Sequence, residues 1–113
     1  PGRHSTRAVK RTAADTTTSI LQSVVEKGTA TAARGAGRPA AGKTGTAEED
    51  TAALFAGYTP DLATVVSVMG QDPKTAKHVP LYGALGVARM NGGGPPTEIW
   101  SQYVKQALKG KKA

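Results

Sequence analysis

The feature that most constrains this chain is a lysine between two glycines, followed by a pattern typical of a strand hairpin. Residues 42–46 read Gly-Lys-Thr-Gly-Thr, which places one ammonium group and two hydroxyls on a stretch of small residues. Residues 52–58 and 62–69 form two short apolar runs, separated by a Thr-Pro-Asp turn. These runs predict two antiparallel strands directly after the lysine. Amides, hydroxyls and an ammonium group gathered in this way would suit an anion.

A helix is predicted before these strands, over residues 13–27. Its apolar side chains recur at three-and-four spacing and build one stripe. Thr12 is the expected N-cap, Asp15 stands in a capping-box-like position, and Gly28 is the expected stop. Residues 29–37 are small and poor in bulky apolar side chains, so they predict a flexible segment rather than a buried strand.

A second helix is predicted near the other end of the chain. Thr97 is its expected N-cap, after the Gly- and Pro-rich run 91–96, and Gly110 is its expected stop. A polar loop over residues 71–80 and a short helix over residues 81–90 are expected before it. The apolar face expected to pack on the sheet comprises Ile99, Trp100, Tyr103, Val104, Ala107 and Leu108. Antiparallel strands flanked by helices predict an α+β fold, in the form of an α/β sandwich.

Composition limits the classes of function. The chain has 113 residues, enough for one domain, and its net charge of +7 favours an anionic partner. The positive charges crowd the two ends without interleaved aromatic residues, so nucleic-acid binding is not predicted. There is no cysteine, and neither a metal site nor a cofactor is predicted. No apolar run approaches the roughly 20 residues that span a bilayer, and no secretory signal opens the chain. The start at Pro1 suggests a processed product or a piece of a longer chain.

Three interpretations of the lysine stretch remain open on the residues alone. It could be an ordinary exposed turn. It could be a nucleotide-binding loop, because Gly37, four residues and then Gly-Lys-Thr satisfy the pattern G-x-x-x-x-G-K-[ST]. That loop requires a buried strand before it and a helix starting at Lys43, and the sequence favours neither. The third interpretation is an edge strand of an acyl-transfer site, since K-T-G is a signature of penicillin-recognising enzymes.

Four blocks support the third interpretation. Residues 18–29, 37–46, 55–64 and 96–103 resemble, in order, the helix, active-site strand, hairpin and closing helix of one family. Together they span roughly residues 13–108. The chain therefore resembles the C-terminal part of the transpeptidase domain of class A, bifunctional penicillin-binding proteins.

This resemblance implies a partial DD-transpeptidase and β-lactamase-like fold over residues 12–110. Residues 1–11 have no periodicity and are expected to be a basic flexible segment, and residues 111–113 a basic tail. It also implies a place on the outer face of a bacterial membrane, with the anchor outside this chain. The implied partners are peptidoglycan stem peptides, β-lactams and the remainder of the domain. Nothing here resembles the separate glycosyltransferase domain of that class.

The resemblance also implies a role for each residue of the signature. Lys43 is similar to the lysine that helps to move protons around the nucleophile. Thr44 and Thr46 are similar to the residues that bind the carboxylate of D-alanine or of a β-lactam, and the Thr46 amide to half of the oxyanion hole. Gly45 would let the substrate lie close against the strand.

One departure from the family is clear. The nucleophile of the family lies in S-x-x-K and a second serine in S-x-N, and the chain has neither pattern at any of its serines: Ser5, Ser19, Ser23, Ser67 and Ser101. His4 and His78 show no spacing that would join a Ser-His-Asp arrangement, and we interpret them as surface residues. The chain is therefore expected to be inactive alone and to supply half of an active site. A non-catalytic binding or scaffolding piece is the alternative.

Overall fold

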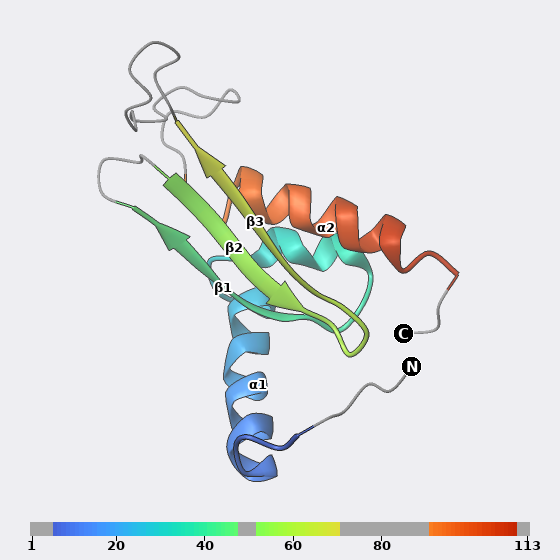
Figure 1. The fold of residues 1–113 in the computed structure, drawn as a ribbon. Coiled ribbons are helices and arrows are strands. Elements are labelled where there is room, and N and C mark those ends of the chain that lie inside the picture. Colours follow the sequence, from blue (N-terminus) through green and yellow to red (C-terminus); the bar gives the residue numbers. More distant parts are fainter. Residues whose placement is uncertain (1–5, 48–51, 71–90, 111–113) are drawn as a thin grey trace.

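The fold is a small antiparallel sheet with helices packed against it. The computed structural model describes residues 6–47, 52–70 and 91–110 (Figure 1). In order, its elements are helix α1 (Arg11–Glu26), the 3₁₀ helix η1 (Thr31–Ala36), strands β1 (Ala41–Thr46), β2 (Ala52–Tyr58) and β3 (Ala63–Met69), and helix α2 (Pro95–Ala107). The strands form one antiparallel sheet in the order β1-β2-β3. The predicted α+β class is confirmed.

Both faces of the sheet can be read from the register. On β2, Ala53, Phe55 and Gly57 are buried, and this is the face that α2 covers. Leu54 and the other alternate residues of β2 lie on the opposite side, which we call the open face. Figure 1 shows α2 and η1 side by side behind the sheet, while α1 lies below β1. The sheet is therefore covered unevenly, and one of its faces remains largely bare.

The predicted hairpin between β2 and β3 is confirmed. The Thr59 amide donates to the carbonyl of Leu62 at 2.8 Å and closes the turn. The Thr59 hydroxyl accepts hydrogen bonds from the amides of Asp61 and Leu62, each at 3.2 Å. Pro60 lies at the second position of this turn, where its fixed φ is favourable. Local sequence chemistry is sufficient to specify this element.

Two aromatic rings form the centre of the core. Phe55 of β2 and Trp100 of α2 are fully buried, with ring centroids 5.1 Å apart and planes at 83°. This edge-to-face arrangement is favourable beyond the burial of area. The Trp100 indole Nε1 donates to the carbonyl of Thr64 on β3 at 3.1 Å. One side chain of α2 thus joins two strands of the sheet.

Residues 29–37 are not a flexible segment, and that expectation is wrong. They include η1, and three alanines of this stretch are buried against α2: Ala30, Ala33 and Ala36. An alanine every three residues gives a smooth surface on a 3₁₀ helix, whose side chains repeat with that period. The small residues therefore allow η1 and α2 to approach closely. The low content of bulky apolar residues does not indicate this packing from the sequence.

The caps of both long helices also differ from the expectation. The N-cap of α1 is Lys10, and no side chain caps the helix, so the roles expected of Thr12 and Asp15 are wrong. Helix α2 begins at Pro95 with Gly94 as its N-cap. Proline suits the first turn because its missing N–H would have no partner there. Thr97 lies inside the helix instead of capping it.

The apolar face of α2 is narrower than its periodicity predicts. Trp100, Val104 and Leu108 are buried as expected. Ile99 and Ala107 are exposed, and Tyr103 retains 54% of its surface, so the expected packing of these three side chains is wrong. On α1 only Val25 is fully buried, and its predicted stripe is mostly in contact with solvent.

Several expectations lie outside the described residues: the loop at 71–80, the helix at 81–90, and both histidines. Across the described part of the chain, no helix combines the length and hydropathy that a membrane span requires.

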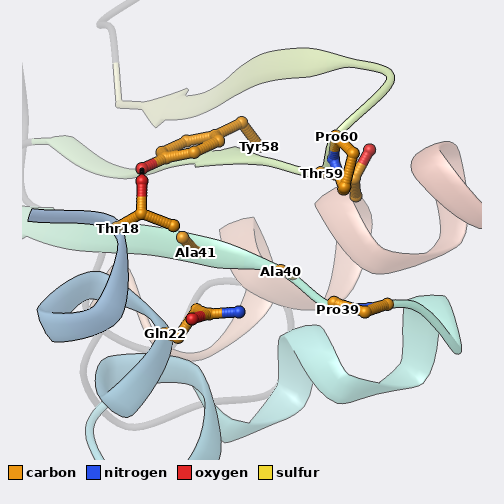
Figure 2. Close-up of a pocket in the computed structure, with 8 residues that line it drawn as sticks. All are labelled: Thr18, Gln22, Pro39, Ala40, Ala41, Tyr58, Thr59 and Pro60. Atoms are coloured by element: carbon orange, nitrogen blue, oxygen red, sulfur yellow. Dashed lines mark hydrogen bonds between the residues drawn. The ribbon is translucent and has the colours of Figure 1, made fainter. Parts of the chain in front are cut away.

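One hydrogen bond joins α1 to the sheet. The hydroxyls of Thr18 and Tyr58 lie 2.7 Å apart and are partly buried, and they point toward each other across a small pocket (Figure 2). A double-mutant cycle of Thr18→Val and Tyr58→Phe is expected to give a coupling free energy of about 1 kcal/mol by urea unfolding. Tyr103→Phe, at an exposed hydroxyl on α2, is the control and should change stability little. If the two substitutions changed the free energy of unfolding additively, this hydrogen bond would not hold α1 in place.

Candidate functional site

The lysine stretch forms a strand at one edge of the sheet. All of the signature residues lie within β1, which pairs with β2 on one side and with no other described strand. Lys43 and Thr46 are exposed, while Thr44 and Gly45 are partly buried. A nucleotide-binding loop would need a helix to begin at the lysine. Because β1 continues through Lys43, the nucleotide-binding interpretation is wrong.

The register separates the lysine from the two threonines. Lys43 and Gly45 stand opposite Ala56 and Leu54 of β2, so they lie on the open face. Thr44 and Thr46 stand opposite residues of the α2-covered face, Phe55 and Ala53. The ammonium group thus lies on one face of the strand and the two hydroxyls on the other. One ligand can contact all three groups only if it lies along the edge of the strand. The residues therefore favour a ligand that lies beside β1.

Gly45 leaves room on the open face, beside the Leu54 side chain. A methyl group built at this position would meet the Leu54 side chain at 3.4 Å and nothing closer, which is ordinary van der Waals contact. Gly42 is different, because a methyl group there would lie 2.4 Å from the Phe55 ring. Packing inside the protein thus requires glycine at position 42 but not at 45. The Gly92 backbone lies against Gly45, since a methyl group built at Gly92 would lie 2.8 Å from both the amide nitrogen and the carbonyl oxygen of Gly45.

The Lys43 ammonium is held close to its own strand. Its Nζ donates to the carbonyl of Thr44 at 3.1 Å. The side chain lines a shallow hollow on the open face with, among others, Leu21, Ala56 and Val65. A positive charge is therefore displayed beside an apolar surface, in an exposed position where its long side chain can move toward a ligand.

The hydroxyls of Thr44 and Thr46 are hydrogen-bonded to residues that lie far from β1 in the sequence. The hydroxyls of Thr44 and Thr29 lie 2.9 Å apart, and the Gly92 amide donates to Thr46 Oγ1 at 3.2 Å. Sequence reasoning missed Thr29 and Gly92, because they lie 15 and 46 positions from their partners. The one signal is the glycine run 92–94, which belongs to the Gly- and Pro-rich stretch before the expected N-cap Thr97.

Among the described residues, no serine is hydrogen-bonded to Lys43, whose Nζ donates to the Thr44 carbonyl. Ser23 and Ser101 each donate to a carbonyl of their own helix, Ile20 and Glu98 respectively. Ser67 lies on β3, which β2 separates from β1. Within residues 6–47, 52–70 and 91–110, no cluster of three His, Asp or Glu side chains could hold a metal ion. The site offers recognition groups without a nucleophile.

A separate pocket lies between α1 and the start of β1 (Figure 2). Its volume is about 150 Å³, and its wall contains no charged side chain. Its lining residues are Thr18, Gln22, Pro39, Ala40, Ala41, Tyr58, Thr59 and Pro60. None of the signature residues contributes to it, so we do not assign it to the functional site.

Comparison with known proteins gives one consistent result. Residues 1–89 match the family described as penicillin binding protein transpeptidase domain. Penicillin-binding protein 1A of Neisseria meningitidis serogroup A is 37% identical over 94 residues, covering 82% of this chain and 10% of that protein. The protein of the same name from Neisseria gonorrhoeae is 36% identical over 94 residues, and that from Neisseria lactamica 36% over 93, again covering 10% of each.

The chain thus spans about a tenth of the length of these relatives. The family match covers most of the 113 residues, and the K-T-G signature lies on an edge strand of an antiparallel sheet. The chain belongs to the family of penicillin-binding protein transpeptidase domains.

Proposed function

We propose that this chain supplies the K-T-G strand of a peptidoglycan transpeptidase, which cross-links stem peptides by serine acyl transfer and reacts with β-lactams. The observation that carries the proposal is the position of β1. It is an edge strand that presents an ammonium group and two hydroxyls to a ligand lying beside it. Family membership supports the same activity.

The proposed reaction has two acyl-transfer steps. A serine Oγ attacks the carbonyl carbon of the D-Ala–D-Ala peptide bond, the C–N bond breaks, and D-alanine leaves with a proton on its nitrogen. The amine of a second stem peptide then attacks the acyl-serine ester, and the serine oxygen regains a proton. Lys43 stabilises negative charge and helps to transfer protons, and the Thr46 amide donates to the developing oxyanion. Thr44 and Thr46 bind the terminal carboxylate of the substrate.

The nucleophile comes from residues outside this chain. The open face carries exposed apolar side chains, with Val65 and Met69 of β3 retaining 64% and 59% of their surfaces. Exposed apolar side chains gathered on one side of a domain are a sign of a docking surface. We infer that the remainder of the transpeptidase domain packs on this face and brings its S-x-x-K serine to Lys43.

The same proposal sets the location of the protein. Stem peptides lie outside the cytoplasmic membrane, so the site must lie on that side. The net charge of +7 is favourable near an anionic envelope. A membrane anchor would be supplied outside this chain.

The test uses a fluorescent penicillin. We define the complemented domain as this chain combined with the upstream part of the transpeptidase domain that carries S-x-x-K. The chain alone is expected to stay unlabelled, because it lacks the nucleophile, and the complemented domain is expected to become covalently labelled. In-gel fluorescence after denaturation measures the label, with benzylpenicillin as competitor. An unlabelled complemented domain would favour a non-catalytic binding or scaffolding role instead.

A further inference from the structure

Each threonine hydroxyl of β1 has a hydrogen-bond partner behind it. For Thr46 the direction of the bond is fixed. The Gly92 amide can only donate, so Thr46 Oγ1 is the acceptor, and the hydroxyl must direct its own proton elsewhere. A hydroxyl that already accepts one hydrogen bond is polarised and becomes a better donor. Gly92 therefore prepares Thr46 to donate to an anion.

Thr29 holds Thr44 in the same way. Their hydroxyl oxygens lie 2.9 Å apart, and geometry alone allows either to donate. If Thr44 gives its proton to a carboxylate, only Thr29 can be the donor in this pair, because each hydroxyl has one proton. Thr29 is exposed, since it lies in the turn between α1 and η1, so its hydroxyl is not needed to fill the core.

The loop that carries Gly92 is fixed against the sheet. A methyl group at Gly92 would lie 2.2 Å from the Leu54 carbonyl oxygen, and one at Gly93 would lie 2.0 Å from the Thr29 carbonyl oxygen. The backbone therefore lies too close to its neighbours for any side chain. The buried Thr97 hydroxyl of α2 donates to the Gly92 carbonyl. The loop thus contacts both Thr29 and β1, and α2 anchors it.

We propose that Thr29 and the loop of residues 91–94 are positioning elements for carboxylate recognition. They orient the hydroxyls of Thr44 and Thr46 so that both donate to the carboxylate of the ligand beside β1. This inference rests on the proposed function, because it assigns the two hydroxyls to that carboxylate. It adds a role for residues outside the K-T-G strand, none of which touches the substrate.

The test compares acylation of the complemented domain by a penicillin that has a free carboxylate and by its methyl ester. Thr29→Val keeps the shape of the side chain but removes the hydroxyl. It is expected to lower the second-order acylation rate constant for the free acid about fivefold, the effect of one neutral hydrogen bond. The rate constant for the ester should be unchanged, since the ester lacks the charge that Thr44 recognises. Mass spectrometry of the intact protein measures both reactions.

Two variants complete the design. Thr29→Ser retains the hydroxyl and should restore the rate constant for the free acid. Thr31→Val makes the same change at an exposed threonine two positions away and should have no effect. Equal losses for acid and ester, or no loss for either, would overturn the inference while leaving the proposed function intact. A complemented domain without substitutions that fails to react with the free acid would instead remove the proposed function.

Discussion

Replacing Lys43 by alanine in the complemented domain is expected to lower the rate of acylation by penicillin about 100-fold or more. The side chain is exposed, and its one described hydrogen bond is to the adjacent residue, Thr44. Its removal should therefore leave the fold unchanged while removing the positive charge beside the nucleophile. Stopped-flow or quenched labelling with fluorescent penicillin measures the rate, and circular dichroism checks the fold.

The matched control is Lys105→Ala, which removes an exposed lysine from α2. It should lower neither the acylation rate nor the thermal stability, so that a general effect of net charge can be separated from a local one. If Lys43→Ala reacted with penicillin as fast as the unsubstituted domain, Lys43 would have no part in the mechanism. The K-T-G strand would then serve binding alone.

Replacing Trp100 by alanine is expected to lower the free energy of unfolding by about 3–5 kcal/mol. The indole is fully buried, contacts the Phe55 ring edge to face, and donates to the Thr64 carbonyl. The substitution would leave a cavity between α2 and the sheet and a carbonyl without its donor. Urea unfolding followed by far-ultraviolet circular dichroism measures the change, because the variant has no other tryptophan to report by fluorescence.

Tyr103→Ala is the control for this prediction. It removes a large aromatic side chain from the same helix, but Tyr103 is 54% exposed. Tyr103→Ala should lower the free energy of unfolding by no more than about 1 kcal/mol, as other surface substitutions do. Similar losses for both variants would mean that helix propensity, rather than the Phe55–Trp100 contact, explains the stability of α2.

Much of the fold could be predicted from local sequence. The two short apolar runs of β2 and β3, the second rich in β-branched residues, specify a hairpin with the Thr-Pro-Asp turn between them through neighbouring contacts alone. Periodicity located both long helices to within a few residues. It could not decide which apolar side chains would be covered. Ile20 and Tyr103 fit their stripes as well as Val25 and Trp100 do, yet only the second pair is buried.

The supporting contacts of the site could not be predicted. No sequence pattern relates Thr29 or Gly92 to β1. Thr29 precedes its partner on the strand by 15 positions and Gly92 follows its partner by 46, so their contacts with the strand form only when the chain folds. The alanines of η1 appeared too small to build a core, but their size is what permits the close packing of α2. Such features depend on the distance between elements, which local propensity does not contain.

By itself, the sequence determined the chemical groups of the site and the strand that presents them. One lysine, two threonines and a glycine over four positions, followed by a hairpin, favoured a K-T-G edge strand, which the structure has. The acyl-transfer site and its dependence on an S-x-x-K serine from other residues are what we propose from it. Only the tertiary structure decided how these groups are aimed. The register sends Lys43 to the open face and both threonines to the opposite one. Thr29 and the loop of residues 91–94 then hold the two hydroxyls. The physical reason is that side-chain direction along a strand alternates by local geometry, whereas a hydroxyl is oriented by whichever partner the fold brings to it.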